Sequence, residues 1–229
     1  MLITRPEPGA SATAQRVAAM GLVPVVAPVL RVEALPVAWP EPASLRAILA
    51  ASGNAVAAIP PAWRALPLLA VGDATARKAR EAGFAHVESA DGDARALAGL
   101  AAARFPATGP PLLLASGEGQ GAALAAALGA LGVAVIRREV YAARPVARLP
   151  DPAGAALGAG SLGAALFFSA ETARAFAGLL DAAGLAGRAE GVEALAIGQP
   201  AAGALSVLPW RAIRVAARPT EDAMLAMLR

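Results

Sequence analysis

The sequence predicts an α/β protein of two doubly wound parallel-sheet domains, flavodoxin- or Rossmann-like, which a two-stranded linker joins and of which the first is discontinuous in the chain. Short apolar segments that end in small polar loops alternate with alanine-rich helical segments, which predicts parallel sheets with helices on both faces. Two further segments, 23–36 and 133–145, run from apolar to charged residues and end at a proline. This pattern is typical of strands that leave one core and cross to another. A chain of 229 residues is long enough for two such cores.

The strands are predicted from the apolar runs, in chain order. We expect them near residues 2–4, 23–27, 46–50, 68–71, 112–115, 133–136, 164–168, 193–197 and 212–216. The first two and the last three belong to one sheet, and the four between them to the other. The expected domains are residues 1–32 with 147–229, and 36–140, with linker strands at 30–37 and 138–146.

The helices are predicted from their boundary residues. Thr220 places a hydroxyl cap before two acidic residues, and Asp73 and Ser169 offer similar caps. Glycines follow helical runs at positions where a helix is expected to end, namely Gly21, Gly83, Gly132 and Gly184. The uncharged stretch 119–136 is long enough for a membrane span, but its glycines and its change to β-branched residues favour a helix followed by a buried strand.

Composition excludes several classes of protein. There is no cysteine, so disulfides and thiolate metal sites are excluded. The net charge is +3, and the arginines form no basic run with interleaved aromatic residues, which argues against nucleic-acid binding. The chain opens as a strand rather than as a targeting segment, so we expect a cytoplasmic protein without membrane contact.

The loops at the carboxyl ends of the strands predict where a ligand binds. Each has backbone N–H groups at a helix start together with a hydroxyl or a glycine, which suits an anion. These loops are Ser52–Asn54, Gly72–Thr75, Ser116–Gly117, Ser169, Gly198–Gln199 and Arg218–Thr220. Taken singly, each hydroxyl could be only a helix cap. Taken together, they favour a ligand with many carboxylates, held where two sheet edges face across one cleft.

Conventional catalytic motifs are missing from the sequence. The single histidine, His86, lies in a surface link before a short strand, and no cluster of acidic residues has the spacing of metal ligands. One motif competes: the glycine-rich run Gly117–Gly121 follows a strand and opens a helix, with Glu139 at the distance expected for a ribose contact. A dinucleotide enzyme is therefore one alternative, although Glu118 would place a carboxylate beside the pyrophosphate.

Seven segments, in order and spacing, resemble uroporphyrinogen-III synthases over nearly the whole chain. They are LITRPEPGA from Leu2, S-x-N-A-V at Ser52–Val56, AVGDATA from Ala70, LLLASGE from Leu112, VYAARP from Val140, LFFSAETA from Leu166 and RPTEDA from Arg218. The family's fold has two α/β domains with a two-stranded linker, in agreement with the pattern of connectors. A second alternative is a non-enzymatic two-domain sensor that closes on an anionic ligand. Such sensors usually carry a partner surface or an output domain, and the seven segments and their connectors account for nearly the whole chain.

The resemblance implies a cyclising hydro-lyase of haem biosynthesis. Its substrate is hydroxymethylbilane, a linear tetrapyrrole, which it closes to uroporphyrinogen III with loss of water and inversion of the terminal pyrrole ring. The resemblance implies no cofactor and no metal. It also implies a monomer, with at most transient contact with the preceding enzyme of the pathway.

The resemblance also implies the site residues. Tyr141 matches the family's tyrosine and is the candidate general acid; the alternative is that it only packs the hinge between the domains. The candidate substrate-binding residues are Arg5, Ser52, Asn54, Thr75, Ser116, Gly117, Ser169, Gly198, Gln199 and Thr220. The chain departs from the family pattern in the short, proline-rich segment after Asn54, at Ala170-Glu171, and at Gly198-Gln-Pro.

Overall fold

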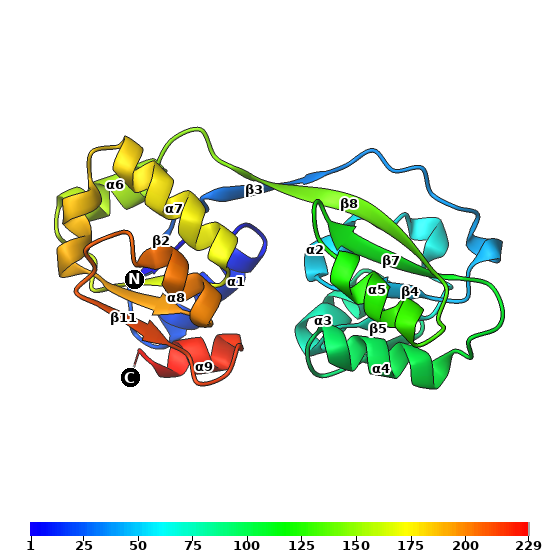
Figure 1. Ribbon diagram of the computed structural model, residues 1–229. Helices are drawn as coiled ribbons and strands as arrows, with labels where there is room; N and C mark the ends of the chain where they lie inside the picture. The colour runs from blue at the N-terminus through cyan, green and yellow to red at the C-terminus, as the bar shows by residue number, and fades with distance from the viewer. Residues whose placement is uncertain (229) are drawn as a thin grey trace. The chain divides into compact units, whose positions relative to one another are not determined.

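The computed structural model describes residues 1–228, which form two compact units. One unit combines residues 1–31 with the chain from residue 144 onward, and the other is residues 32–143. The chain therefore leaves the first unit, builds the second, and returns (Figure 1). Both crossing points lie within the segments expected to be linker strands.

The first unit contains a five-stranded parallel sheet. Its order is β11 (Ala212–Val215), β10 (Glu193–Ala196), β9 (Ala164–Phe167), β1 (Leu2–Ile3) and β2 (Val25–Val26). Numbered by their order in the chain, these strands run 2-1-3-4-5, which is the flavodoxin-like arrangement. In this arrangement the strand order reverses between β1 and β9.

Helices cover both faces of this sheet. They are α1 (Gly9–Ala19), α6 (Asp151–Gly158), α7 (Ala170–Ala182), α8 (Gln199–Leu205), α9 (Glu221–Ala226) and the 3-10 turn η3 (Ala186–Gly191). On one face, Ile3 and Leu166 pack with Val17 of α1 and Met224 of α9. On the other face, Phe167 meets Phe176 of α7 edge-on, with ring centroids 5.4 Å apart. Neighbouring residues of one strand thus enter opposite cores, as the pleat of a strand requires.

The second unit contains a six-stranded sheet. Its order is β3 (Leu30–Ala34), β8 (Val135–Pro145), β7 (Leu112–Gly117), β4 (Ile48–Ala50), β5 (Leu68–Ala70) and β6 (Val87–Ser89). The strands from β8 to β6 are parallel. When β3 is left out and the other five strands are numbered by their order in the chain, they run 3-2-1-4-5 across the sheet. This is the Rossmann arrangement, and the strand order reverses between β4 and β7.

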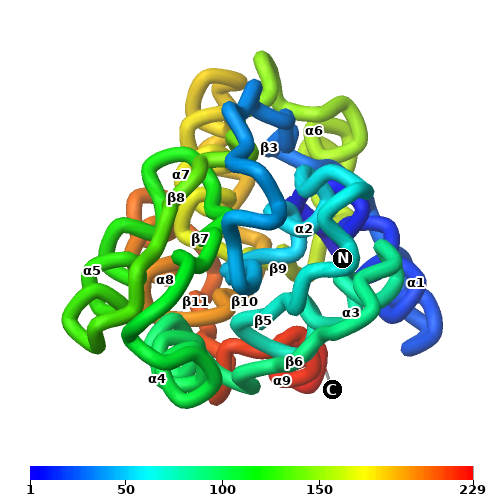
Figure 2. Tube along the Cα trace, turned by 90° about the vertical axis from the view of Figure 1, so that its right-hand side faces the viewer, coloured from blue at the N-terminus to red at the C-terminus, as the bar shows by residue number. Residues whose placement is uncertain are grey.

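Two cores sandwich this sheet. Ile48 and Leu113 pack on the side of α2 (Gly53–Ala58) and α3 (Asp73–Glu81), whereas Leu49 and Leu114 pack on the side of α4 (Ala94–Arg104) and α5 (Ala122–Ala130). Figure 2 shows α4 and α5 on one side of β5 and β7, and α2 and α3 on the other. Short 3-10 turns, η1 (Pro42–Ser44) and η2 (Pro61–Trp63), complete the unit.

Strands β3 and β8 form the two-stranded linker and lie side by side in Figure 1. The amide of Leu35 donates to the carbonyl of Val140 at 3.1 Å, and the amide of Val146 donates to the carbonyl of Val29 at 3.0 Å. The partner number falls as the residue number rises, so the two strands run antiparallel. The predicted fold class is confirmed.

Most helix boundaries agree with the sequence predictions, and one does not. The hydroxyls of Ser169 and Thr220 accept hydrogen bonds from the amides three residues ahead, at 3.0 and 3.2 Å, as N-caps do. The prediction that Asp73 caps α3 is wrong, because Gly72 occupies the N-cap and Asp73 is the first helical residue. The glycines predicted to end helices, Gly21, Gly83, Gly132 and Gly184, all have positive φ. Within residues 1–228, no helix is long and apolar enough to cross a membrane.

Candidate functional site

The loops after β4 and β7 lie at the point where the strand order of the second unit reverses. Ligands of doubly wound sheets bind at this point, beyond the carboxyl ends of the strands. The loop after β4 carries Ser52, and the loop after β7 consists of residues 118–121, directly after Gly117 at the end of the strand. Tyr141 comes to the same place from β8, where Gly117 is its partner across the ladder.

A bulge in β8 sets the direction of the Tyr141 side chain. Ser116 pairs with Glu139 but Gly117 pairs with Tyr141, so Val140 is an extra residue in β8. A bulge of this kind bends the strand and redirects a side chain. Val140 and Tyr141, although consecutive, both join the core on the α2 and α3 side, and only 5% of Tyr141 is exposed.

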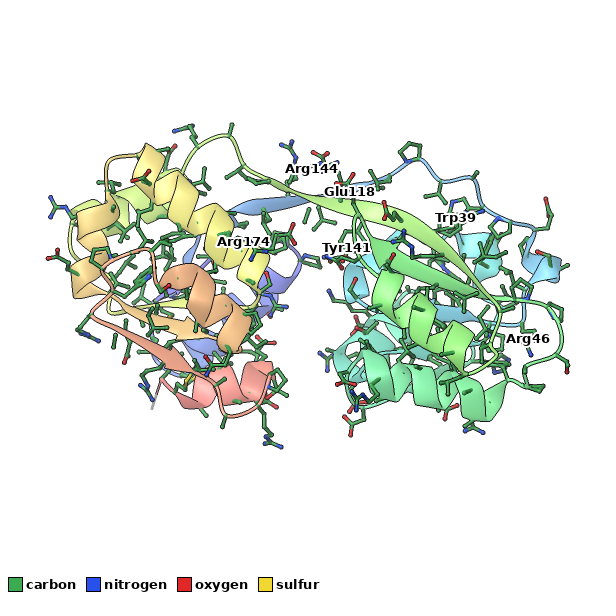
Figure 3. All side chains as sticks on the ribbon, in the orientation of Figure 1. Trp39, Arg46, Glu118, Tyr141, Arg144 and Arg174 are labelled. Atoms are coloured by element: carbon green, nitrogen blue, oxygen red, sulfur yellow. The ribbon has the colours of Figure 1, made fainter. Side chains whose placement is uncertain are left out.

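The phenol of Tyr141, labelled in Figure 3, has polar contacts with both loops. Ser52 Oγ donates a hydrogen bond to Tyr141 Oη at 3.1 Å, and Oη donates to Gln120 Oε1 at 3.5 Å. Ser52 Oγ in turn accepts from the amide of Ala55 at 3.2 Å and so caps α2. The chain thus brings together Ser52 and Tyr141, two predicted site residues that are 89 positions apart.

The glycine-rich loop 117–121 is held by contacts within the unit. The amide of Gly119 donates to Glu139 Oε1 at 3.1 Å, and Arg137 donates to the Gln120 carbonyl at 2.6 Å. The hydroxyl of Ser116, which is 1% exposed, donates to the same carbonyl at 3.0 Å. Because Glu139 is bound to the loop itself, the arrangement gives no support to the dinucleotide alternative.

The other predicted residues of this unit surround the start of α2 and α3. Asn54 lies in the first turn of α2 and is half-buried, whereas Thr75 is buried in the first turn of α3. The sequence reasoning missed Lys78, the only lysine of the chain. A Cβ atom on Gly53, beside Ser52, would lie 2.9 Å from Lys78 Nζ. The signal was available, because Lys78 lies three residues after Thr75 and so on the same face of α3.

Arg5 occupies the corresponding reversal point of the first unit, between β1 and β9. Its guanidinium carbon lies 4.2 Å from the ring centroid of Phe168, in the loop after β9. Its NH1 donates to Thr13 Oγ1 at 3.2 Å and lies 3.7 Å from a carboxylate oxygen of Glu221. Burial lowers the pKa of Arg5, and the charge of Glu221 partly offsets that effect.

The sequence reasoning missed the two residues that hold Arg5. Thr13 is fully buried on α1 and donates to Glu221 Oε1 at 2.7 Å. Glu221 begins α9, directly after the cap Thr220. Ser169 contacts the hydroxyl of Thr172 at 2.9 Å, and Gly198 and Gln199 open α8 after β10. The predicted residues of this unit therefore all follow carboxyl ends of strands in one sheet.

Potential metal ligands do not cluster in the described part of the chain. Among residues 1–228, there is no group of three or more His, Asp or Glu side chains that could hold a metal ion. His86 is exposed, as expected for a surface link. It lines a pocket of about 420 Å³ with Glu88, Arg104 and Phe105, at the amino ends of β5 and β6 and so away from Tyr141.

Comparisons with known proteins agree with this architecture. The family model of uroporphyrinogen-III synthase HemD matches residues 11–226. The structure of uroporphyrinogen-III synthetase from Helicobacter pylori is 15% identical, with a TM-score of 0.65 over 99% of this chain and 97% of that chain. A mutant uroporphyrinogen III synthase from the extremely thermophilic bacterium Thermus thermophilus is 25% identical, with a TM-score of 0.51 over 99% of this chain and 96% of that one. No curated protein matches the chain.

Proposed function

The chain belongs to the uroporphyrinogen-III synthase family, the cyclising lyases of haem biosynthesis, and from this premise we propose that Tyr141 is its general acid. The family's reaction removes the terminal hydroxyl of hydroxymethylbilane as water and closes the ring with inversion of the last pyrrole. The observation that carries the proposal is the place of the phenol, beside the reversal point of a Rossmann-type sheet and in contact with the loops after β4 and β7.

The proposed acid step transfers one proton. The phenolic O–H of Tyr141 gives its proton to the leaving oxygen while the C–O bond of the hydroxymethyl group breaks, and water departs. The electron-rich pyrrole stabilises the cation that remains, and the hydrogen bond from Ser52 stabilises the phenolate. Ring closure then releases a proton from a pyrrole carbon, and the phenolate recovers it. The acid is thus restored without any external proton source.

We propose that the remaining residues restrain the substrate. A flexible linear tetrapyrrole must be held in one folded conformation, with its two ends close together, before the ends can react. Positioning of the substrate therefore supplies much of the rate acceleration. The guanidinium of Arg5 can bind a carboxylate through two parallel N–H···O hydrogen bonds. The other proposed contacts come from the loops and from the first turns of the helices that follow them, namely Ser52, Asn54, Thr75, Ser169, Gly198, Gln199 and Thr220.

Two predicted residues fit a supporting role better. The Ser116 hydroxyl already donates to the Gln120 carbonyl, and Gly117 lies against the ring of Tyr141. We therefore propose that Ser116 and Gly117 shape the surroundings of the phenol rather than bind carboxylates. Direct substrate contact would come from their neighbours in the loop.

Product analysis tests this function. Hydroxymethylbilane is supplied to the purified protein, the products are oxidised, and the type I and type III porphyrins are separated beside a sample without protein. The proposal predicts mainly type III porphyrin. Type I porphyrin alone, at the rate of the protein-free sample, would contradict it.

We further propose a cytoplasmic monomer that meets the preceding enzyme only transiently. The motive for such contact is chemical, because free hydroxymethylbilane closes spontaneously to the uninverted isomer. Sedimentation of the purified protein over a range of concentrations tests the monomeric state, and a mass that rises with concentration would contradict it.

A further inference from the structure

A directed chain of three hydrogen bonds passes through Tyr141. The Ala55 amide donates to Ser52 Oγ at 3.2 Å, Ser52 Oγ donates to Tyr141 Oη at 3.1 Å, and Oη donates to Gln120 Oε1 at 3.5 Å. Ser52 uses its one proton toward the phenol, and the phenol donates to Gln120. The last bond is well beyond the 2.7–2.8 Å that is usual between oxygen atoms, so it is weak.

We propose that Gln120 is a positioning residue, which directs the phenolic proton of Tyr141 until the leaving hydroxyl of the substrate replaces it as acceptor. This inference rests on the proposed function. A weak acceptor suits the role, because it fixes the rotation of the O–H group while costing little when it is exchanged for the substrate oxygen.

The backbone around Gln120 is built to hold its side chain in place. The Gln120 carbonyl accepts from Ser116 Oγ and from Arg137, and the preceding residue, Gly119, is bound to Glu139. The side chain itself is exposed, so it contributes little to the core. A substitution at this position therefore changes the acceptor without unfolding the unit.

Charged side chains lie on several of the elements that contribute to this site. Glu118 lies in the same loop as Gln120, Arg137 and Glu139 lie on β8, and Lys78 reaches Gly53 from α3. A comparison of variants at position 120 alone keeps these charges constant.

The single tyrosine of the chain makes a direct test possible, because phenolate absorbance then reports only Tyr141. An acceptor stabilises the neutral phenol, so Gln120→Leu is expected to move its titration midpoint to lower pH. Gln120→Glu, which brings a carboxylate, is expected to move the midpoint to higher pH. Gln15→Leu, on the exposed face of α1, is the matched control and should leave the midpoint unchanged.

Turnover supplies the second measurement. Gln120→Leu is expected to lower kcat about fivefold, with KM within about twofold, since one hydrogen bond is worth about 1 kcal/mol. Identical titration midpoints in the Leu and Glu variants, or an unchanged kcat in Gln120→Leu, would overturn the role of Gln120. The titration needs no substrate, so it decides this point even if the wild-type protein forms only type I product and the proposed function fails.

Discussion

Gly117 and Tyr141 approach each other so closely that only glycine fits. A Cβ atom at position 117 would lie 2.8 Å from Cζ and 2.9 Å from Oη of Tyr141. Both are buried, and they are partners across the β7–β8 ladder at the bulge. Glycine here makes room for the phenol to lie against the strand.

Gly117→Ala should therefore displace the phenol. We expect overpacking to lower the free energy of unfolding by about 1–3 kcal/mol, and kcat to fall on the order of tenfold or more because the acid is misplaced. Urea unfolding and steady-state kinetics measure the two effects. Gly99→Ala is the control, since a Cβ atom there meets nothing within 4 Å on α4 and should be neutral or stabilising. Full activity in Gly117→Ala would contradict the proposed place of the phenol.

Ser52 has two roles that its variants should separate. Ser52→Ala loses both the cap of α2 and the hydrogen bond to Tyr141, so we expect lower stability, by about 1 kcal/mol, and lower kcat. Ser52→Thr keeps the hydroxyl and should retain most of both. Asp93→Ala, which removes the cap of α4, should lower stability without lowering kcat. Equal activity of Ser52→Ala and wild type would show that the hydrogen bond to Tyr141 has no part in turnover.

The Asp93 cap also predicts a dependence of stability on pH. The amides of Ala96 and Arg95 lower the pKa of Asp93 from its ordinary value by donating to its carboxylate. A lowered pKa means that the stabilisation is complete above the ordinary pKa of about 4. The stabilisation is lost as the pH falls through the lowered value. Asp93→Asn should reduce the acid-side loss of stability in thermal unfolding followed between neutral and strongly acid pH. An unchanged acid-side slope would contradict the prediction.

Thr13 is expected to stabilise the surroundings of Arg5. Thr13→Val keeps the shape of the buried side chain but removes the hydroxyl that lies between Arg5 and Glu221. Loss of hydrogen bonds to charged groups should lower the free energy of unfolding by about 1.5–3 kcal/mol. Ser206→Ala, which removes an exposed hydroxyl bonded to the Gly203 carbonyl, should change it by less than about 0.5 kcal/mol in the same urea titration. Equal effects would refute a special role for Thr13.

The fold could be predicted because its signals are local. Apolar strands, polar loops and alanine-rich helices repeat along the chain, and a helix-ending glycine such as Gly132 takes the positive φ that other residues avoid. The cap of α3 shows where local signals compete. Asp73 and Gly72 are both acceptable N-caps, and only the backbone conformation determines that Gly72 takes the position.

Much of the site could not be predicted, because it depends on pairing between distant segments. Thr13 and Glu221 are 208 positions apart, and only the packing of α1 against α9 brings them together. The bulge at Val140 leaves no mark in the alternation of β8, yet it decides where the Tyr141 side chain points. Gln120 belonged to a glycine-rich run whose pattern suggested phosphate binding, whereas its side chain contacts the phenol.

Comparison of wild type with Tyr141→Phe, supplied with hydroxymethylbilane, tests the central claim most directly. The variant keeps the buried ring and loses only the phenolic oxygen, so its fold should be intact by circular dichroism. We expect type III porphyrin from the wild type, and from the variant a kcat lower on the order of a hundredfold or more, with type I porphyrin dominant. Type III product at the wild-type rate from Tyr141→Phe would contradict the claim that Tyr141 is the acid.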